Sequence, residues 1–363
     1  MKKIFLVVLL FIAFSLFCNE PPVVSNVVVE QRNDGTYFVD IYYDLEDTDG
    51  DNMMVSISAS DDEGESWDYP IISLSGDTGY NITSGNNKQI IWDFATDHPE
   101  VLNIPTMIKV TADDRDISGI EGMVFVQGGT FEMGDHFNEG SSDELPVHEI
   151  TLNSFYIGQY EVTQGEYESV MGSNPANGYG VGENYPIYNV TWYDAVEYCN
   201  VLSIQYGRTP CYDLSDWSCD FSANGYRLLT EAEWEYAARG GVNWTDDYRY
   251  SGCHEESDLV DYAIYISNDP GHTEVVGSKL PNQLDIYDMS GNVYEWCNDW
   301  YSSDYYSSSP ADNPTGPDSE AYRITRGGGW LLNANSCRVA NRNSVNPSSS
   351  YYGMGFRILR ALN

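Results

Sequence analysis

The 363-residue sequence predicts a β-sandwich domain at residues 21–115, followed by a larger, loop-rich domain with few helices at residues 116–363. A chain of this length has room for two domains. The first part consists of short alternating runs separated by turn residues, which is typical of strands. The second part is rich in Gly, Asn, Ser, Tyr and Trp, and regular periodicity is scarce apart from three helix starts.

The strands of the first domain are predicted from apolar alternation. Residues 27–31 and 37–43 form a hairpin, because Asn33-Asp34-Gly35 between them is a turn signal. Further strands are predicted at residues 55–59, 90–92 and 107–110. A series of short strands of this kind favours an immunoglobulin-like or fibronectin type III sandwich.

The helices of the second domain are predicted from capping boxes, in which a hydroxyl stands three residues before a carboxylate. The three N-caps are Thr163, Thr191 and Thr230. The third helix is expected to end at Gly240-Gly241, a favoured C-cap. The second helix is expected to bury apolar residues at helical spacing, namely Trp192, Ala195, Val196, Cys199 and Leu202.

The charge of the chain excludes one class of partner. Lys plus Arg is 17 and Asp plus Glu is 56, which gives a formal net charge of −39. Nucleic-acid binding depends on cationic contacts with phosphates, so no nucleic-acid partner is expected. An anionic membrane surface is disfavoured for the same reason.

The N-terminus predicts export. Lys2 and Lys3 precede an apolar run at residues 4–14, which is typical of a signal peptide, and we assign residues 1–18 to it. The run is too short for a membrane span, so none is expected in the mature chain. The protein is therefore expected to be extracellular, periplasmic or on the cell surface. Cys18 offers the alternative of a lipoprotein.

Export permits disulfide bonds. The short spacing of Cys211 and Cys219 within a polar stretch makes them the best local pair. The cysteines that remain after residue 18 are Cys199, Cys211, Cys219, Cys253, Cys297 and Cys337.

Six segments occur in one order over the second domain: GMVFVQGGTFEMG at 122–134, EVT at 161–163, YRLLTEAEWEYAARGG at 226–241, GNVYEW at 291–296, RGGGW at 326–330 and GFR at 355–357. They resemble the formylglycine-generating enzyme family, also called the sulfatase-modifying-factor domain. The resemblance implies an α+β fold related to C-type lectins, with little regular structure. A β-sandwich ahead of this domain is a familiar arrangement in exported family members.

The resemblance also implies an activity, the oxidation of a sulfatase cysteine to formylglycine with O₂. The family enzymes hold copper(I) between two cysteine thiolates, because soft thiolates select Cu(I). The matching positions here are Leu332 and Cys337, so one thiolate is missing. Gly329 and Tyr294 also replace the Ser and Trp of the family motifs. Cys337 is the only catalytic candidate, and the missing partner favours a buried or disulfide-bonded Cys337 instead.

The resemblance further implies a calcium site around the Gly-Asn motif. Asp288 would supply a carboxylate, and Met289, Gly291 and Val293 would supply backbone carbonyls. Hard oxygen ligands from an irregular loop suit Ca²⁺. The alternative is a plain turn, in which Asp288 and Asn292 accept hydrogen bonds from nearby amides.

The C-terminal stretch is crowded with adaptable contact residues. They are Asn333, Asn335, Ser336, Asn341, Asn343, Ser344, Asn346, Ser348, Ser349, Ser350, Tyr351 and Tyr352. In lectin-like proteins diversified by retroelements, such a segment displays variable contacts, which predicts a surface for a protein or glycan ligand; ordinary polar loops are the alternative. Arg338, Arg342 and Arg357 are expected to brace the frame by pairing with buried acids.

Two functions therefore compete. The missing thiolate favours a non-catalytic, exported family member that acts as a binding or surface protein. The alternative is a formylglycine-generating oxidase that acts on a cysteine of sulfatases.

Overall fold

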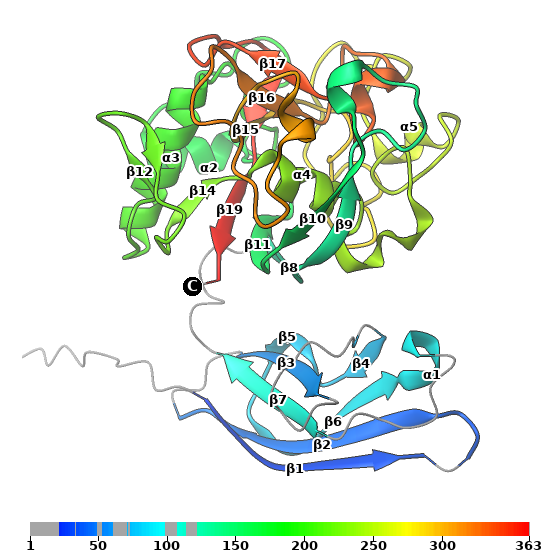
Figure 1. Ribbon diagram of the computed structural model, residues 1–363. Coiled ribbons are helices and arrows are strands. Elements are labelled where there is room, and N and C mark those ends of the chain that lie inside the picture. The colour runs from blue at the N-terminus through cyan, green and yellow to red at the C-terminus, as the bar shows by residue number, and fades with distance from the viewer. Residues whose placement is uncertain are drawn as a thin grey trace, which may run out of the picture. The chain divides into compact units, whose positions relative to one another are not determined.

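The computed structural model describes residues 22–32, 34–48, 53–60, 71, 73–98, 107–113 and 122–362 (Figure 1). The predicted signal peptide and Cys18 lie outside these residues. The chain divides between residues 120 and 121 into two compact units. Each unit is described by itself.

The described strands of the first unit form two antiparallel sheets. One has the order β1-β2-β6-β4 and the other β5-β3-β7. The elements are β1 (Val23–Gln31), β2 (Phe38–Glu46), β3 (Met53–Ser60), β4 (Leu74–Gly76), β5 (Gly79–Ile82), β6 (Gly85–Asp93), the single-turn α1 (Phe94–Asp97) and β7 (Met107–Asp113). Ile41 and Trp92 of the first sheet share one hydrophobic core with Val55 and Val110 of the second. The assignment of this unit to the immunoglobulin or fibronectin type III fold stays a prediction.

The second unit mixes helices and strands and is strand-rich. Its sheets have the orders β14-β19-β11-β8, β17-β16-β15-β18, β10-β9 and β12-β13. The strands are β8 (Met123–Val126), β9 (Gly129–Met133), β10 (His148–Leu152), β11 (Phe155–Gly158), β12 (Tyr212–Asp213), β13 (Ser218–Cys219), β14 (Tyr226–Leu228), β15 (Tyr294–Trp300), β16 (Arg323–Arg326), β17 (Asn343–Val345), β18 (Met354–Phe356) and β19 (Ile358–Ala361). The helices are α2 (Gln164–Met171), α3 (Trp192–Gln205), α4 (Glu231–Ala238) and α5 (Leu259–Tyr262).

The three predicted helix starts are confirmed. Thr163, Thr191 and Thr230 are the N-caps of α2, α3 and α4, and each forms a complete capping box. Gly240, with φ of +95°, follows the last turn of α4 in the left-handed conformation that Gly adopts most readily. The apolar positions predicted for α3 are all buried.

Helix α4 is the buried centre of the second unit. It contacts β9, β15 and β16, and Figure 1 shows it enclosed by the strands. Every one of its residues is buried, including the three glutamates Glu231, Glu233 and Glu235. A carboxylate in such a place is costly unless a cation pairs with it.

Arginines pair with each of these glutamates. Arg342 donates to both carboxylate oxygens of Glu231 at 2.7 and 2.9 Å. Arg326 and Arg239 both bond to Glu235. Burial acts to raise the pKa of Glu235, but the two cations outweigh it together with the hydrogen bonds, so that this pKa lies below its ordinary value. Glu233, the third glutamate of α4, forms an equally close pair with Arg227 of β14. The α4 carboxylates therefore fix the strands and loops from which the arginines come.

The predicted bracing role of the three C-terminal arginines is confirmed. Arg338 donates to both oxygens of Glu144 at 2.8 Å. Arg357 donates to Glu295 at 2.7 Å, and Arg342 belongs to the α4 network. The C-terminal stretch is thus attached to the core at several points.

We predict that Arg342→Met destabilises the second unit by about 3–5 kcal/mol, because Glu231 would be left as an uncompensated buried charge. The control is Arg249→Met, since Arg249 and its partner Glu139 are 24% and 31% exposed; loss of such a pair costs about 0–1 kcal/mol. Denaturant unfolding of the full chain measures both. Equal losses in the two variants would contradict the assignment.

Candidate functional site

A pocket of about 300 Å³ opens between the C-terminal loops and the ends of β15, β17 and β18. Its lining is mostly apolar. The residues that line it are Tyr294, Gly329, Trp330, Leu331, Leu332, Asn343, Val345, Tyr351, Tyr352, Gly353 and Met354. The segment that the sequence singled out contributes Asn343, Val345, Tyr351 and Tyr352 to this lining.

Aromatic rings gather at the rim of this pocket. Tyr179, from a loop distant in sequence, packs against Tyr352 with ring centroids 4.6 Å apart and against Trp330 at 5.6 Å. Tyr351 is 52% exposed, and Tyr352 and Tyr179 are 42% and 40% exposed. Exposed tyrosines around a buried Trp are typical of a binding surface rather than of a solvated loop.

The predicted contact residues are displayed and not buried. None of the Asn, Ser and Tyr residues named for the stretch 333–352 is buried. Between them stand buried anchors such as Ala334, Val339 and Pro347. Backbone hydrogen bonds hold residues 351–353 in place. Asn189 N–H donates to Tyr351 C=O at 3.0 Å, and Tyr294 N–H donates to Gly353 C=O at 2.8 Å.

Cys337 does not line the pocket. It is fully buried beside Tyr250 and Cys253, and burial raises the pKa of its thiol to about 12. Leu332, at the position of the missing thiolate, does line the pocket. The described residues therefore do not fit a two-thiolate copper(I) centre, which needs two accessible thiolates.

The predicted Cys211–Cys219 disulfide is absent from this structure, in which every described cysteine is a free thiol. Cys211 immediately precedes β12, where Tyr212 pairs with Cys219 on β13. Burial raises the pKa of the Cys219 thiol, and the nearby Cys211 contributes to this rise.

The predicted calcium loop contains a buried carboxylate with one unsatisfied oxygen. Asp288 Oδ2 accepts a hydrogen bond from Gly277 N–H at 2.7 Å, whereas Oδ1 is buried without a hydrogen-bond partner. Burial raises the pKa of Asp288 to about 6. The plain-turn contacts are also present, since Asn292 Oδ1 accepts from Glu274 N–H at 3.0 Å. These contacts satisfy only some of the hydrogen-bonding groups of the loop, because Asp288 Oδ1 has no partner.

Two backbone carbonyls of this loop lie close to Gly327. A Cβ placed on Gly327 would lie 3.5 Å from Met289 O and 3.8 Å from Val293 O. Gly291 has φ of +90°, and a Cβ there would come within 2.4 Å of Ile264 O, so only Gly fits. A carboxylate oxygen without a hydrogen-bond partner and backbone carbonyls are donor types that suit Ca²⁺.

Glu161 is a site residue whose role sequence reasoning missed. Its carboxylate accepts from Asn292 Nδ2 at 2.7 Å and from Val293 N–H at 3.0 Å. Burial and the nearby Asp288 raise its pKa well above the ordinary value. Its place in the EVT motif was the available signal. Among the described residues, no group of three or more His, Cys, Asp or Glu side chains is arranged to hold a metal.

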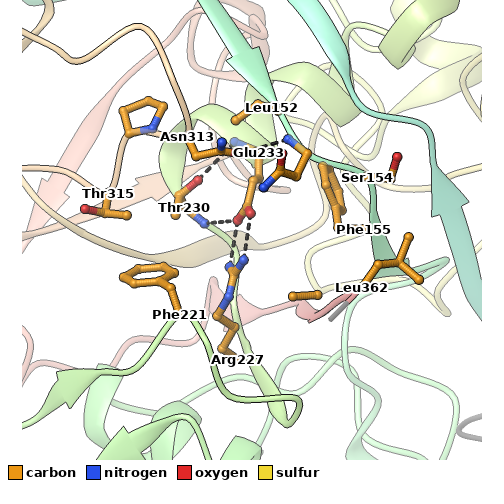
Figure 2. A pocket seen from close by; sticks show the side chains of 13 residues that line it. Leu152, Ser154, Phe155, Phe221, Arg227, Thr230, Glu233, Asn313, Thr315 and Leu362 are labelled. Atoms are coloured by element: carbon orange, nitrogen blue, oxygen red, sulfur yellow. Dashed lines mark hydrogen bonds and ion pairs between the residues drawn. The ribbon is translucent and has the colours of Figure 1, made fainter. Parts of the chain in front are cut away.

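A second pocket, of about 160 Å³, has a charged wall (Figure 2). Arg227 and Glu233 point toward each other there and form two hydrogen bonds of 2.7 Å. Thr230 N–H and Leu228 C=O bond to the same pair. These groups satisfy one another, so the pair braces the start of α4 and offers little to a ligand.

No helix within the described residues is long and apolar enough to span a membrane.

Comparisons with known proteins identify the family. The Sulfatase-modifying factor enzyme 1-like domain matches residues 110–362. A protein named chaperone protein LppX from Paenibacillus barcinonensis is 35% identical over 66% of this chain and 90% of its own length. The formylglycine-generating enzyme of Streptomyces coelicolor is 30% identical over 65% of this chain and 88% of its own.

A solved structure agrees with these relatives. Treponema denticola variable protein 1 superposes with a TM-score of 0.59 and 33% identity, covering 66% of this chain and 94% of that protein. Since the family domain accounts for most of the chain, the chain belongs to the family of the sulfatase-modifying factor enzyme 1-like domain.

Proposed function

We propose that this protein is a non-catalytic member of its family and that the C-terminal surface binds a protein or glycan ligand. The observation that carries the proposal is the display of Asn, Ser and Tyr side chains around an aromatic-rimmed pocket, on a frame of buried arginine pairs. Exposed Tyr and Asn provide contact area and adaptable hydrogen bonds.

The competing oxidase function lacks its metal ligands. Leu332 occupies the pocket where a thiolate would be needed, and Cys337 lies outside the pocket with a protonated thiol. An aliphatic side chain does not coordinate Cu(I). The signal-peptide pattern supports export, where such a binding surface would meet its ligand.

The binding function predicts which residues matter. Replacing Tyr179, Tyr351 and Tyr352 together by Ala should weaken ligand binding at least about tenfold, since buried aromatic contacts dominate such interfaces. The matched control is Tyr322→Ala, because Tyr322 is 48% exposed and does not line the pocket. Binding to arrays of glycans and of cell-surface proteins measures the effect. A ligand that binds the triple variant as well as the wild type would refute the assigned surface.

The absence of catalysis is testable directly. We expect the purified, copper-loaded protein to form no formylglycine above background from a cysteine-containing sulfatase peptide in the presence of O₂. Leu332→Cys should raise copper affinity by adding a thiolate, without restoring turnover, because Gly329 and Tyr294 also depart from the family motifs. Mass spectrometry of the peptide is the measurement. Turnover by the wild type that Cys337→Ser abolishes would establish the oxidase instead.

We further propose that Ca²⁺ binds the 288–293 loop through Asp288 and the carbonyls of Met289, Gly291 and Val293. The buried Oδ1 atom of Asp288, which has no hydrogen-bond partner, supports the proposal. A divalent cation would compensate the buried negative charge of Asp288. Glu161 would position the loop through Asn292 and Val293.

Calcium should therefore stabilise the second unit. At 100 times its dissociation constant, a ligand that binds only the native state adds about 2.7 kcal/mol. Chelation should lower Tm, and Asp288→Ala should remove this response. Asp285→Ala is the control, because Asp285 is exposed and also has positive φ, so both variants carry the same backbone cost. Identical melting curves with and without chelator would count against the site.

A further inference from the structure

The C-terminal pocket has an unusual combination of walls. The rings of Tyr294, Trp330, Tyr351 and Tyr352 line it, and the remaining side chains are aliphatic apart from Asn343 and Met354. No Lys, Arg, His, Asp or Glu stands among its described lining residues. Aromatic faces carry partial negative charge, so a pocket with several rings and no basic group attracts a cation.

The charge of the surrounding protein acts in the same direction. In residues 331–352, only Arg338 and Arg342 are charged at neutral pH. Both are buried and paired with Glu144 and Glu231, so neither presents positive charge to the pocket. With a net charge of −39, the long-range field favours cations and repels anions.

The polarity of the pocket selects among cations. A primary ammonium has three N–H donors, and burial without acceptors is costly for each of them. The mostly apolar lining provides few acceptors. A quaternary ammonium group has no N–H, so it can enter such a pocket and contact the rings with its methyl groups. The volume of about 300 Å³ accommodates a group of this size.

We propose that this pocket binds a quaternary ammonium group, which would be the chemical feature that the C-terminal surface recognises in its ligand. This inference rests on the proposed binding function and makes it specific. Trp330 and Tyr352 would supply the rings that contact the cation, and Tyr179 packs against both of them.

Choline and 3,3-dimethylbutan-1-ol provide the test, because they have nearly the same shape and differ in the charge of the head group. Titration of the full-length protein by calorimetry should show choline binding about tenfold more tightly than the neutral alcohol. Tyr351→Leu and Tyr352→Leu keep apolar bulk and remove the ring, so the double variant should lose the preference. Tyr322→Leu, which alters an exposed Tyr outside the pocket, should retain it.

Equal binding of the two compounds would overturn the proposal, since the pocket would then recognise apolar shape alone. Failure of both to bind would also overturn it. Neither result would affect the wider binding function, which the Tyr179, Tyr351 and Tyr352 triple variant tests with whole ligands. Nε-trimethyllysine carries the same group on an amino acid; its affinity relative to choline distinguishes a protein source from a choline-bearing one.

Discussion

The second unit depends on the burial of three carboxylates on one short helix. Glu231, Glu233 and Glu235 of α4 are inside the protein, where an unpaired charge would be prohibitive. Each therefore requires an arginine at a fixed distance and angle. Arginine suits this task because its planar guanidinium bonds both oxygens of a carboxylate at once. The fold has to bring these arginines to α4, and this requirement determines where the C-terminal strands and loops lie.

Because of this constraint, the C-terminal segment contains two kinds of residue: buried arginines that hold the fold, and exposed polar residues that are available for contacts. Arg338 and Arg342 point inward to Glu144 and Glu231, while polar residues beyond them such as Asn346, Ser348 and Ser350 are exposed. The exposed side chains contribute little to the buried network. Substitution among them changes the contact chemistry and leaves the arginine pairs intact. A loop-rich surface of this kind can vary in sequence without loss of fold, which agrees with use as a recognition surface.

Local signals made much of the frame predictable. The capping boxes located three helices because hydroxyl and carboxylate at that spacing satisfy each other's backbone donors. The bracing role of Arg338, Arg342 and Arg357 followed from the cost of a buried charge, yet sequence alone did not name Glu144, Glu231 or Glu295 as the partners. Alternation located strands, but it did not reveal the shift of register between Ser25 and Val28, which accompanies a Val27 that is 39% exposed.

The pocket itself was beyond sequence reasoning, because it arises from contacts between distant segments. Tyr179 reaches Trp330 and Tyr352 only in the folded protein, and nothing local to Tyr179 indicates this. The ligand count disfavoured Cys337 as a catalyst, whereas its separation from the pocket emerges only from the fold.

One chain of hydrogen bonds joins the buried carboxylate of Glu161 to a residue that lines the C-terminal pocket. Glu161 accepts from Asn292 Nδ2, and Asn292 C=O in turn accepts from Trp330 N–H at 2.9 Å. Gly291 N–H donates to Gly327 C=O at 2.8 Å in the same region. The 288–293 loop thus holds the backbone of Trp330, which lines the pocket. Any cation that neutralises Asp288 would stabilise the loop from which Trp330 is positioned, so the metal and ligand proposals concern two ends of one connected structure.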